Sequence, residues 1–304
     1  MHDIILHHYP ISLFAEKIRC LLAYKNVPWR SVAQPNMLPK PDLAPLTGGY
    51  RKIPVMQVGA DIYCDTACIA RRIEQLHPDP ACIPEDRWGE IGMLEDWADH
   101  RFTGQVVPSV IAELLPVLPA DILEDRAKMS PMLSKQNLLA MAPHTRSQAL
   151  LSLDQLDCRL SGKSFLIGDE FTLADAACYH PLWFMRHIPH LFEAVSERRA
   201  LASWVDRIAA FGAGDSEAME PSAALEIART ATPADLAPIE GRKLDGIEVG
   251  DTVSIRADDI GVEKVEGVVA RVTGEEIAIR RSDPVVGEIA VHFPRSGYVI
   301  AKAA

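Results

Sequence analysis

The stretch RKIPVMQVGADIYCDT, Arg51 to Thr66, decides the fold of this chain. It predicts a strand that begins after an Ile-Pro step, a two-residue turn at Gly59-Ala60, a second strand, and an Asp-Thr start for the helical pattern ACIARRIEQL. A proline at the mouth of a strand has no amide to donate to a ladder, which indicates a sheet edge or a cis turn. The free amides of the next helix favour an anion. Both a plain hairpin with a capped helix and a ligand platform fit this pattern.

The residues before this stretch complete an α/β pattern. Residues 3–8 (DIILHH) form an apolar run of strand length, and apolar residues recur at helical spacing from Leu13 onward. Residues 27–34 indicate a second strand, and the proline-rich segment behind it has room for at most one irregular turn of helix. The order β-α-β-turn-β-β-α predicts an α/β domain over residues 1–78, with its first two strands parallel because a helical crossover joins them.

Two regions with different patterns follow. After a linker, residues 87–229 show no strand pattern and predict an all-helical domain that several prolines interrupt. A proline-containing boundary separates it from residues 242–304, where five short alternating runs lie between turn residues. Five strands in so short a segment predict a small accessory domain, a closed or nearly closed five-stranded β-barrel.

Composition and charge narrow the function classes. The chain has 304 residues, 48% hydrophobic and 24% charged, which is typical of a soluble protein. Its net charge of −11 argues against a nucleic-acid or anionic-membrane partner, since both need a basic surface. No apolar window approaches the roughly 18 residues of a spanning helix, and the N-terminus has no signal-peptide pattern, so we expect a cytoplasmic location. The six cysteines have no C-x-x-C spacing, which indicates reduced, mostly buried thiols. No metal site is expected.

Two motifs together resemble the glutathione S-transferase family. The first is the α/β order described above, with IPV before the hairpin and an acid-hydroxyl pair at the next helix. The second is FLIGDEFTLADAACYH at residues 165–180, where Thr172 and Asp175 have the spacing of a capping box, similar to the buried capping motif of that family's helical domain. The resemblance covers about residues 1–210. It implies a thioredoxin-like first domain, an all-helical second domain and a homodimer, and it leaves the C-terminal region unexplained.

The resemblance also implies residues that bind glutathione, a tripeptide whose thiol must become a thiolate to react. Pro54 is expected to be cis, with the Ile53 backbone pairing with the cysteinyl unit like an added strand. Asp65 and Thr66 are expected to hold the γ-glutamyl end, with the helix amides receiving its carboxylate. A plain helix cap explains the same two residues equally simply.

The turn before the first helix is the expected place of thiol activation. Ser12 occupies the position at which the helix dipole and a hydroxyl hydrogen bond both favour a thiolate, although a plain N-cap also explains it. Tyr9 is the alternative, because some branches of the family use a tyrosine near the end of the first strand. Arg51 and Lys52 are candidates for the glycyl carboxylate, although such cations are more often solvated surface charges.

The sequence leaves two functions open. The first is a glutathione transferase that activates the thiol of glutathione for attack on a small hydrophobic electrophile, which an apolar pocket of the helical domain would take. The second is a non-catalytic member of the same fold that binds a partner protein, with the C-terminal barrel as an interaction or dimer-forming module. A hydroxyl at Ser12 fits both functions.

Overall fold

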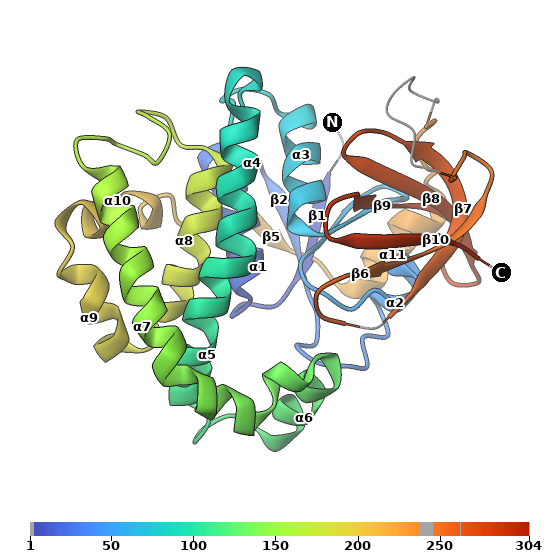
Figure 1. The fold of residues 1–304 in the computed structure, drawn as a ribbon. Coiled ribbons are helices and arrows are strands. Elements are labelled where there is room, and N and C mark those ends of the chain that lie inside the picture. Colours follow the sequence, from blue (N-terminus) through green and yellow to red (C-terminus); the bar gives the residue numbers. More distant parts are fainter. Residues whose placement is uncertain (1–2, 237–245, 262, 304) are drawn as a thin grey trace. The chain divides into compact units, whose positions relative to one another are not determined.

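The computed structural model describes residues 3–236, 246–261 and 263–303, which divide into two compact units (Figure 1). The first, here the sheet unit, takes in Met1–Ala15, Pro28–Arg72 and Ser216–Ala304. The second, here the helical unit, takes in Glu16–Val27 and Ile73–Asp215. The C-terminal segment therefore belongs to the same compact unit as the hairpin at Arg51–Thr66.

The sheet unit is built on one continuous sheet. Among the described residues its strand order is β10-β6-β7-β8-β9-β4-β3-β1-β2-β5. β1 is parallel to β2 and antiparallel to β3, and β3 forms a hairpin with β4, so the predicted α/β order is confirmed. The strands are β1 (Ile4–His8), β2 (Trp29–Ala33), β3 (Val55–Val58), β4 (Asp61–Cys64), β5 (Ser216–Ala218), β6 (Thr252–Ala257), β7 (Val265–Val272), β8 (Glu276–Asp283), β9 (Gly287–Pro294) and β10 (Tyr298–Lys302).

One of these strands, β5, lies where the sequence predicted only helix. The three-residue strand β5 pairs with β2, inside the range 87–229 that was expected to be all-helical. Its residues Ser-Glu-Ala are all exposed, so no apolar alternation marks it as a strand. The helix behind it, α11 (Pro221–Thr230), contacts both β2 and β9 and so lies across the sheet.

The five predicted C-terminal strands are present, but the expected closed barrel is not seen. β6 to β10 pair only with antiparallel neighbours among themselves, and the sheet then continues from β9 into β4 through a parallel ladder in which His292 lies opposite Tyr63. Figure 1 shows these orange and red strands joined through β9 to the blue N-terminal strands. An unpaired strand edge needs a partner, and here the edges of β4 and β9 satisfy each other.

A shared hydrophobic core explains why this junction is stable. The side chains of β4 and of the C-terminal strands belong to one buried cluster, which also receives Leu46 from α2 (Ala44–Thr47) and Ala228 from α11. All four residues of β4 are buried. Burial of apolar area contributes roughly 25 cal/mol per Å², so separating the C-terminal strands from β4 would be costly.

A buried charged cluster lies across the junction. The His292 ring contacts Asp61 through Nε2 at 3.1 Å and Glu276 through Nδ1 at 3.0 Å, and it stacks on Tyr63. Burial opposes the charge on His292, but hydrogen bonds and attraction to both carboxylates raise its pKa above 6.5. The same contacts outweigh burial at Glu276 and lower its pKa to about 2. We infer that a protonated imidazole joins two ionised carboxylates here.

The cluster predicts both a mutational and a pH effect on stability. His292→Phe removes the cation that two buried carboxylates share, although Arg271 still contacts Glu276 at 2.6 Å, and it should lower the free energy of unfolding by about 3 kcal/mol. The wild-type contribution of His292 should be complete below its unfolded pKa near 6.5 and be lost as the pH rises through the higher folded pKa. The contribution of Glu276 should be lost as the pH falls toward about 2.

Urea unfolding of both proteins between pH 2 and 9 checks these expectations. His190→Phe is the matched control, because the His190 side chain is 58% exposed; it should change stability by less than about 0.5 kcal/mol. Equal stability of His292→Phe and wild type at pH 6 would contradict the cluster's role.

The helical unit contains the remaining helices, and a buried capping box organises it. The Asp175 carboxylate accepts hydrogen bonds from the Thr172 amide and hydroxyl, the Leu166 amide and the Trp204 indole, at 2.8–2.9 Å. The predicted capping box is thus confirmed. The helices that lie wholly in this unit are α4 (Trp88–Asp96), α5 (Thr103–Leu114), α6 (Ala120–Met129), α7 (Lys135–Leu160), α8 (Leu173–Met185), α9 (Pro189–Ser196) and α10 (Arg199–Ala209), with short turns Glu85–Arg87, Trp97–Phe102 and Pro131–Leu133.

Two helices begin in the sheet unit and end in the helical unit. They are α1 (Leu13–Tyr24) and α3 (Thr66–Leu76). Past the unit boundary, the Lys17 ammonium of α1 is fully buried and contacts Glu95 at 2.9 Å and Asp99 at 2.6 Å. Burial opposes its charge, but the two carboxylates raise the pKa of Lys17 well above its ordinary value. The Lys17 charge is therefore neutralised by carboxylates of the helical unit.

No helix in the described ranges is long and apolar enough to cross a membrane.

Candidate functional site

The predicted site residues of the sheet unit meet at one end of the sheet. His7 lies opposite Val55, and Val55 lies opposite Cys64, so these residues form a row across β1, β3 and β4. The turn after β1, the Ile-Pro step before β3 and the start of α3 all leave the sheet just beyond that row. The register therefore brings together three segments that are separated in the sequence.

The Ile53-Pro54 step has the geometry of an open peptide-binding edge. Its peptide bond is cis, as expected. Pro54 is buried and the Ile53 side chain packs against the hydrophobic core, so side-chain packing fixes the position of this peptide bond. Among the residues that the structure describes, the backbone amide and carbonyl of Ile53 have no hydrogen-bond partner. Since exposed backbone groups of this kind can pair with an added strand, this step can receive an extended peptide unit.

The start of α3 is held by contacts on both oxygens of Asp65. Oδ1 accepts a hydrogen bond from the Ala67 amide at 2.9 Å, as a helix cap does, and Oδ2 accepts one from the Tyr298 hydroxyl at 3.1 Å. Asp65 has a left-handed backbone (φ 75), a conformation that Asp tolerates better than most residues. Thr66 is buried as the first helical residue. The explanation of Asp65 and Thr66 as a helix cap is therefore confirmed, and Asp65 remains partly exposed.

The turn before α1 carries both candidates for thiol activation. Ser12 is 3% exposed, and its Oγ accepts a hydrogen bond from the Ala15 amide at 3.2 Å, so it caps α1. A capping hydroxyl keeps its proton and can still donate to an anion. Tyr9 is half-buried, and the Lys40 ammonium lies over its ring at 5.6 Å. The cap therefore leaves the Ser12 hydroxyl able to act as a donor.

The two predicted cations, Arg51 and Lys52, form ion pairs with acidic residues of the C-terminal region. The Arg51 side chain, 5% exposed, contacts Glu263 at 3.4 Å, and Lys52 forms an ion pair with Asp259. Both acids lie in the loop between β6 and β7. The interpretation of Arg51 and Lys52 as simple solvated charges therefore does not hold.

Three residues of this end of the sheet were missed by sequence reasoning: Tyr298, Asp259 and Glu263. The hydroxyl of Tyr298 also lies 3.0 Å from that of Tyr50. Burial, together with the charge of Asp65, raises the pKa of Tyr298 well above its ordinary value, which keeps the hydroxyl as a donor. No signal in the sequence marks these residues, because their position depends on the β4–β9 pairing.

The histidines at the end of β1 are engaged in the sheet. The His7 ring contacts Gln57 at 2.9 Å and Gln34 at 3.2 Å, and burial lowers the pKa of His7 to about 4. His8 contacts the Ser31 hydroxyl at 2.8 Å. A neutral, fully engaged His7 is a poor proton acceptor, so the hydroxyls of the turn are the better candidates for chemistry.

The protein's own thiols are poorly suited to react. Five of the six cysteines are buried, as predicted, and burial raises the pKa of Cys82 to about 12 and those of the other four well above the ordinary value. Since the thiolate is the nucleophile, these groups are inert at neutral pH. The exposed Cys158 is in the helical unit.

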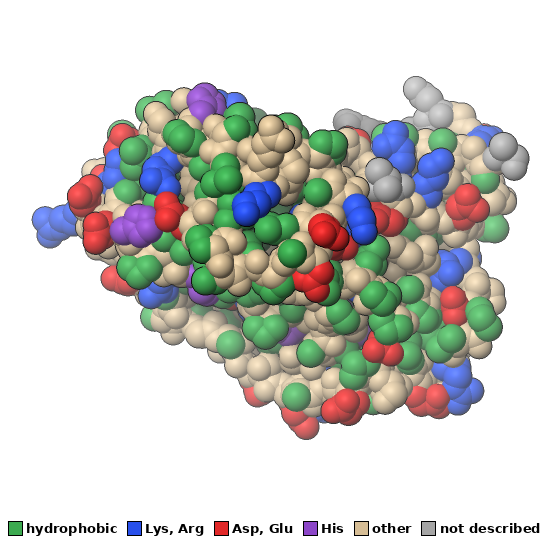
Figure 2. Space-filling view, turned by 90° about the horizontal axis from the view of Figure 1, so that it is seen from below, with side chains coloured by type: hydrophobic (Ala, Val, Ile, Leu, Met, Phe, Trp, Pro, Cys, Tyr) green, Lys and Arg blue, Asp and Glu red, His purple; other side chains and the backbone are tan. Residues whose placement is uncertain are grey.

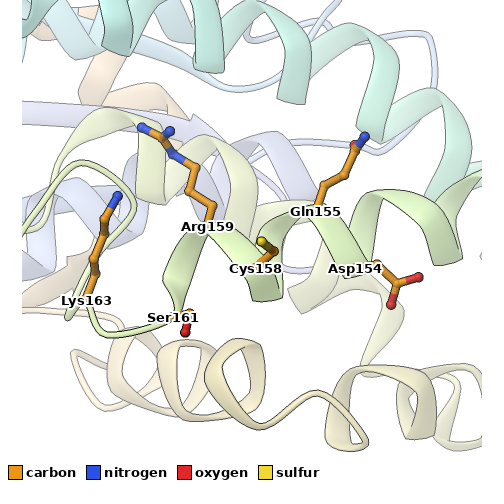
Figure 3. Close-up of a pocket in the computed structure, with 6 residues that line it drawn as sticks. All are labelled: Asp154, Gln155, Cys158, Arg159, Ser161 and Lys163. Atoms are coloured by element: carbon orange, nitrogen blue, oxygen red, sulfur yellow. The ribbon is translucent and has the colours of Figure 1, made fainter.

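Other features of the surface carry no predicted site residue. An open hollow of about 520 Å³ lies at the end of α7 and is lined by Cys158, Arg159 and four further polar residues. Figure 3 labels these six side chains. On the face shown in Figure 2, Lys and Arg side chains are interspersed with Asp and Glu and form no continuous basic area. Within the described ranges, no group of three or more His, Cys, Asp or Glu side chains is arranged to hold a metal ion.

Comparison with known proteins agrees with this geometry. Residues 6–81 match the glutathione S-transferase N-terminal domain, and residues 142–207 match the C-terminal domain of that family. A GST-like protein from Pseudomonas syringae is 38% identical, with a TM-score of 0.81 and coverage of 100% of both chains. A glutathione S-transferase from Rhodospirillum rubrum, 18% identical with a TM-score of 0.55, covers 69% of this chain and 89% of its own, and supports the fold alone.

The chain therefore belongs to the glutathione S-transferase family. A curated relative, a probable maleylacetoacetate isomerase 1 from Drosophila melanogaster, is 23% identical over 177 residues, which are 56% of this chain and 64% of the relative. The full-length match to the Pseudomonas protein includes the C-terminal strands. These strands are therefore shared with at least one relative.

The cap at Asp65 predicts a specific stability pattern. Asp65→Ala removes the oxygen that accepts from Ala67 and puts a less tolerant residue in a left-handed conformation, so it should lower the free energy of unfolding by about 1–2 kcal/mol. Asp65→Asn keeps both the cap oxygen and the conformational tolerance and should stay within about 0.5 kcal/mol of wild type. Urea unfolding measures both variants. Equal stability of the Ala and Asn variants would contradict the cap.

Proposed function

We propose that the chain is a glutathione-dependent transferase that binds glutathione at the end of the sheet unit and activates its thiol. The observation that carries this proposal is the backbone of Ile53, which lies open beside the cis Pro54 at the same end of the sheet as Ser12 and Asp65. The family membership supports the choice of ligand. The proposal also accords with the inert cysteines, since a reactive thiol must then come from the ligand.

Each part of the ligand has a suitable group in the chain. The Ile53 amide and carbonyl pair with the cysteinyl unit, as in the addition of a strand. Asp65 accepts from the γ-glutamyl ammonium, and the first amides of α3 receive the neighbouring carboxylate. Charge-assisted hydrogen bonds of this kind contribute about 1.5–3 kcal/mol each.

Ser12 stabilises the thiolate. Its Oγ accepts from the Ala15 amide and donates its own proton to the sulfur, while the start of α1 favours a negative charge. The thiol proton passes to solvent. The sulfur electron pair then forms a bond to an electrophilic carbon of a small hydrophobic substrate, and the leaving group departs with its electrons or the adduct takes up a proton.

The name of the curated relative indicates a second use of the same thiolate. An isomerase that adds the thiol and then expels it regenerates glutathione, whereas a transferase consumes it. The consumption of glutathione in an activity assay separates these two reactions.

A conjugation assay with paired variants tests the proposal. Ser12→Ala removes the hydroxyl that donates to the sulfur and should lower kcat/KM by about 100-fold, the usual effect of losing one such donor. Tyr9→Phe keeps the ring beneath Lys40 and should stay within about threefold of wild type. Glutathione binding is measured on the same proteins by calorimetry.

The outcomes of this assay are distinct. No binding of glutathione by the wild type contradicts the proposal. Binding without turnover of any thiol-reactive electrophile favours the non-catalytic alternative, a binding or scaffold protein. A large loss in Tyr9→Phe, with an unchanged rate in Ser12→Ala, assigns thiol activation to Tyr9.

We also propose that the protein is a homodimer, by analogy with its family. A two-fold dimer is the most common arrangement of soluble oligomers. Light scattering after size exclusion should give about twice the mass of one chain across a tenfold range of protein concentration. A monomeric mass at all concentrations would contradict the dimer.

A further inference from the structure

The loop between β6 and β7 brings two acidic side chains to the candidate site. Asp259 pairs with Lys52, and Glu263 pairs with Arg51, the two residues that directly precede Ile53. The loop is joined to the start of β10, since the Asp258 amide donates to the Gly297 carbonyl at 3.0 Å. The loop is thus held next to Tyr298, the residue that contacts Asp65.

These groups form one charged cluster. The charges of Asp65 and Asp259 both act on Tyr50, whose hydroxyl contacts that of Tyr298. In the cluster Arg51 pairs with Glu263 and Lys52 pairs with Asp259, while the Asp65 carboxylate accepts from Tyr298. The charge balance of the two ion pairs is therefore neutral, because each cation already has a carboxylate partner in the protein.

This balance matters for a ligand with two carboxylates. Glutathione has one ammonium group and two carboxylates, and the start of α3 accounts for the ammonium and one carboxylate. The resemblance to the family assigns the glycyl carboxylate to Arg51 or Lys52, which already pair with Glu263 and Asp259. It would also lie near those two acids, and like charges in proximity are unfavourable.

We propose that Asp259 and Glu263 determine the ligand specificity of this site. By neutralising Lys52 and Arg51 they select a γ-glutamyl thiol whose second carboxylate is masked as an amide or ester, in preference to glutathione itself. This inference rests on the proposed function, because it concerns the far end of the ligand that the same site binds. The inference assigns to the loop between β6 and β7 a role in recognising the glycyl end of the ligand.

Calorimetry with two probes tests the inference. The probes are glutathione and its glycyl monoethyl ester, which differ by one negative charge. The wild type should bind the ester at least about threefold more tightly than glutathione. The double variant Asp259→Asn/Glu263→Gln keeps the side-chain size but removes the two negative charges that pair with Lys52 and Arg51. It should bind glutathione about tenfold more tightly than the wild type does, in keeping with two partly exposed charge interactions, and its affinity for the ester should stay within about twofold.

A matched control removes the same charge from the same hairpin. Asp258 and Glu266 are exposed, and their carboxylates take no part in the ion pairs with Arg51 and Lys52. Asp258→Asn/Glu266→Gln should therefore keep the wild-type ratio of the two affinities. Thermal unfolding confirms that each variant is folded, and the single variants Asp259→Asn and Glu263→Gln serve if the double variant is not.

The results separate this inference from the proposed function. Tighter binding of glutathione than of the ester by the wild type, or a ratio that the Asp259 and Glu263 substitutions leave unchanged, overturns the inference and leaves the glutathione site in place. An equal change in the control variant also overturns it, because the effect is then one of overall charge. Absence of binding of both probes to every variant overturns the proposed function and the inference with it.

Discussion

The parallel pairing of β9 with β4 is the constraint on which the sheet unit depends. It gives each of two strand edges a partner, joins the C-terminal strands to the N-terminal α/β elements and creates one core. The buried contacts of His292 with Asp61 and Glu276 lie on this junction. An ion cluster of this kind is a weak source of stability compared with apolar packing, but it disfavours any other register, because a shifted strand would leave its charges buried and unpaired.

The same pairing changes the character of the candidate site. In an α/β domain that ended its sheet at β4, the start of α3 would be fixed by its cap alone. Here Tyr298 fixes the second oxygen of Asp65, and the β6–β7 loop holds Arg51 and Lys52. The candidate site residues are thus in contact with groups from a region that the two matched family domains do not include. The full-length match to the Pseudomonas syringae protein includes this region.

Local patterns accounted for much of the fold. The hairpin, the cis Pro54 and the capping box at Thr172 were each predictable, because neighbouring residues or a family motif specify them. The five C-terminal strands were also predictable from alternation. Their attachment to β4 was not, because alternation gives the faces of a strand and says nothing about which distant edge it joins. The strand β5 was not predicted, for a related reason. Its three exposed residues form a strand only because they pair with the edge of β2.

By itself, then, the sequence determined the family, most of the order of the elements and the segments of the candidate ligand platform at Arg51–Thr66. It also determined which residues of that platform have suitable chemistry, since backbone, cap and hydroxyl groups belong to local motifs. The tertiary structure alone decided the surroundings of those residues. Tyr298, Asp259 and Glu263 contact residues of the candidate site because β9 pairs with β4 and so joins the C-terminal strands to the N-terminal part of the sheet. Pairing between strands that lie more than 200 residues apart depends on matching edges and shared burial, which no local pattern encodes.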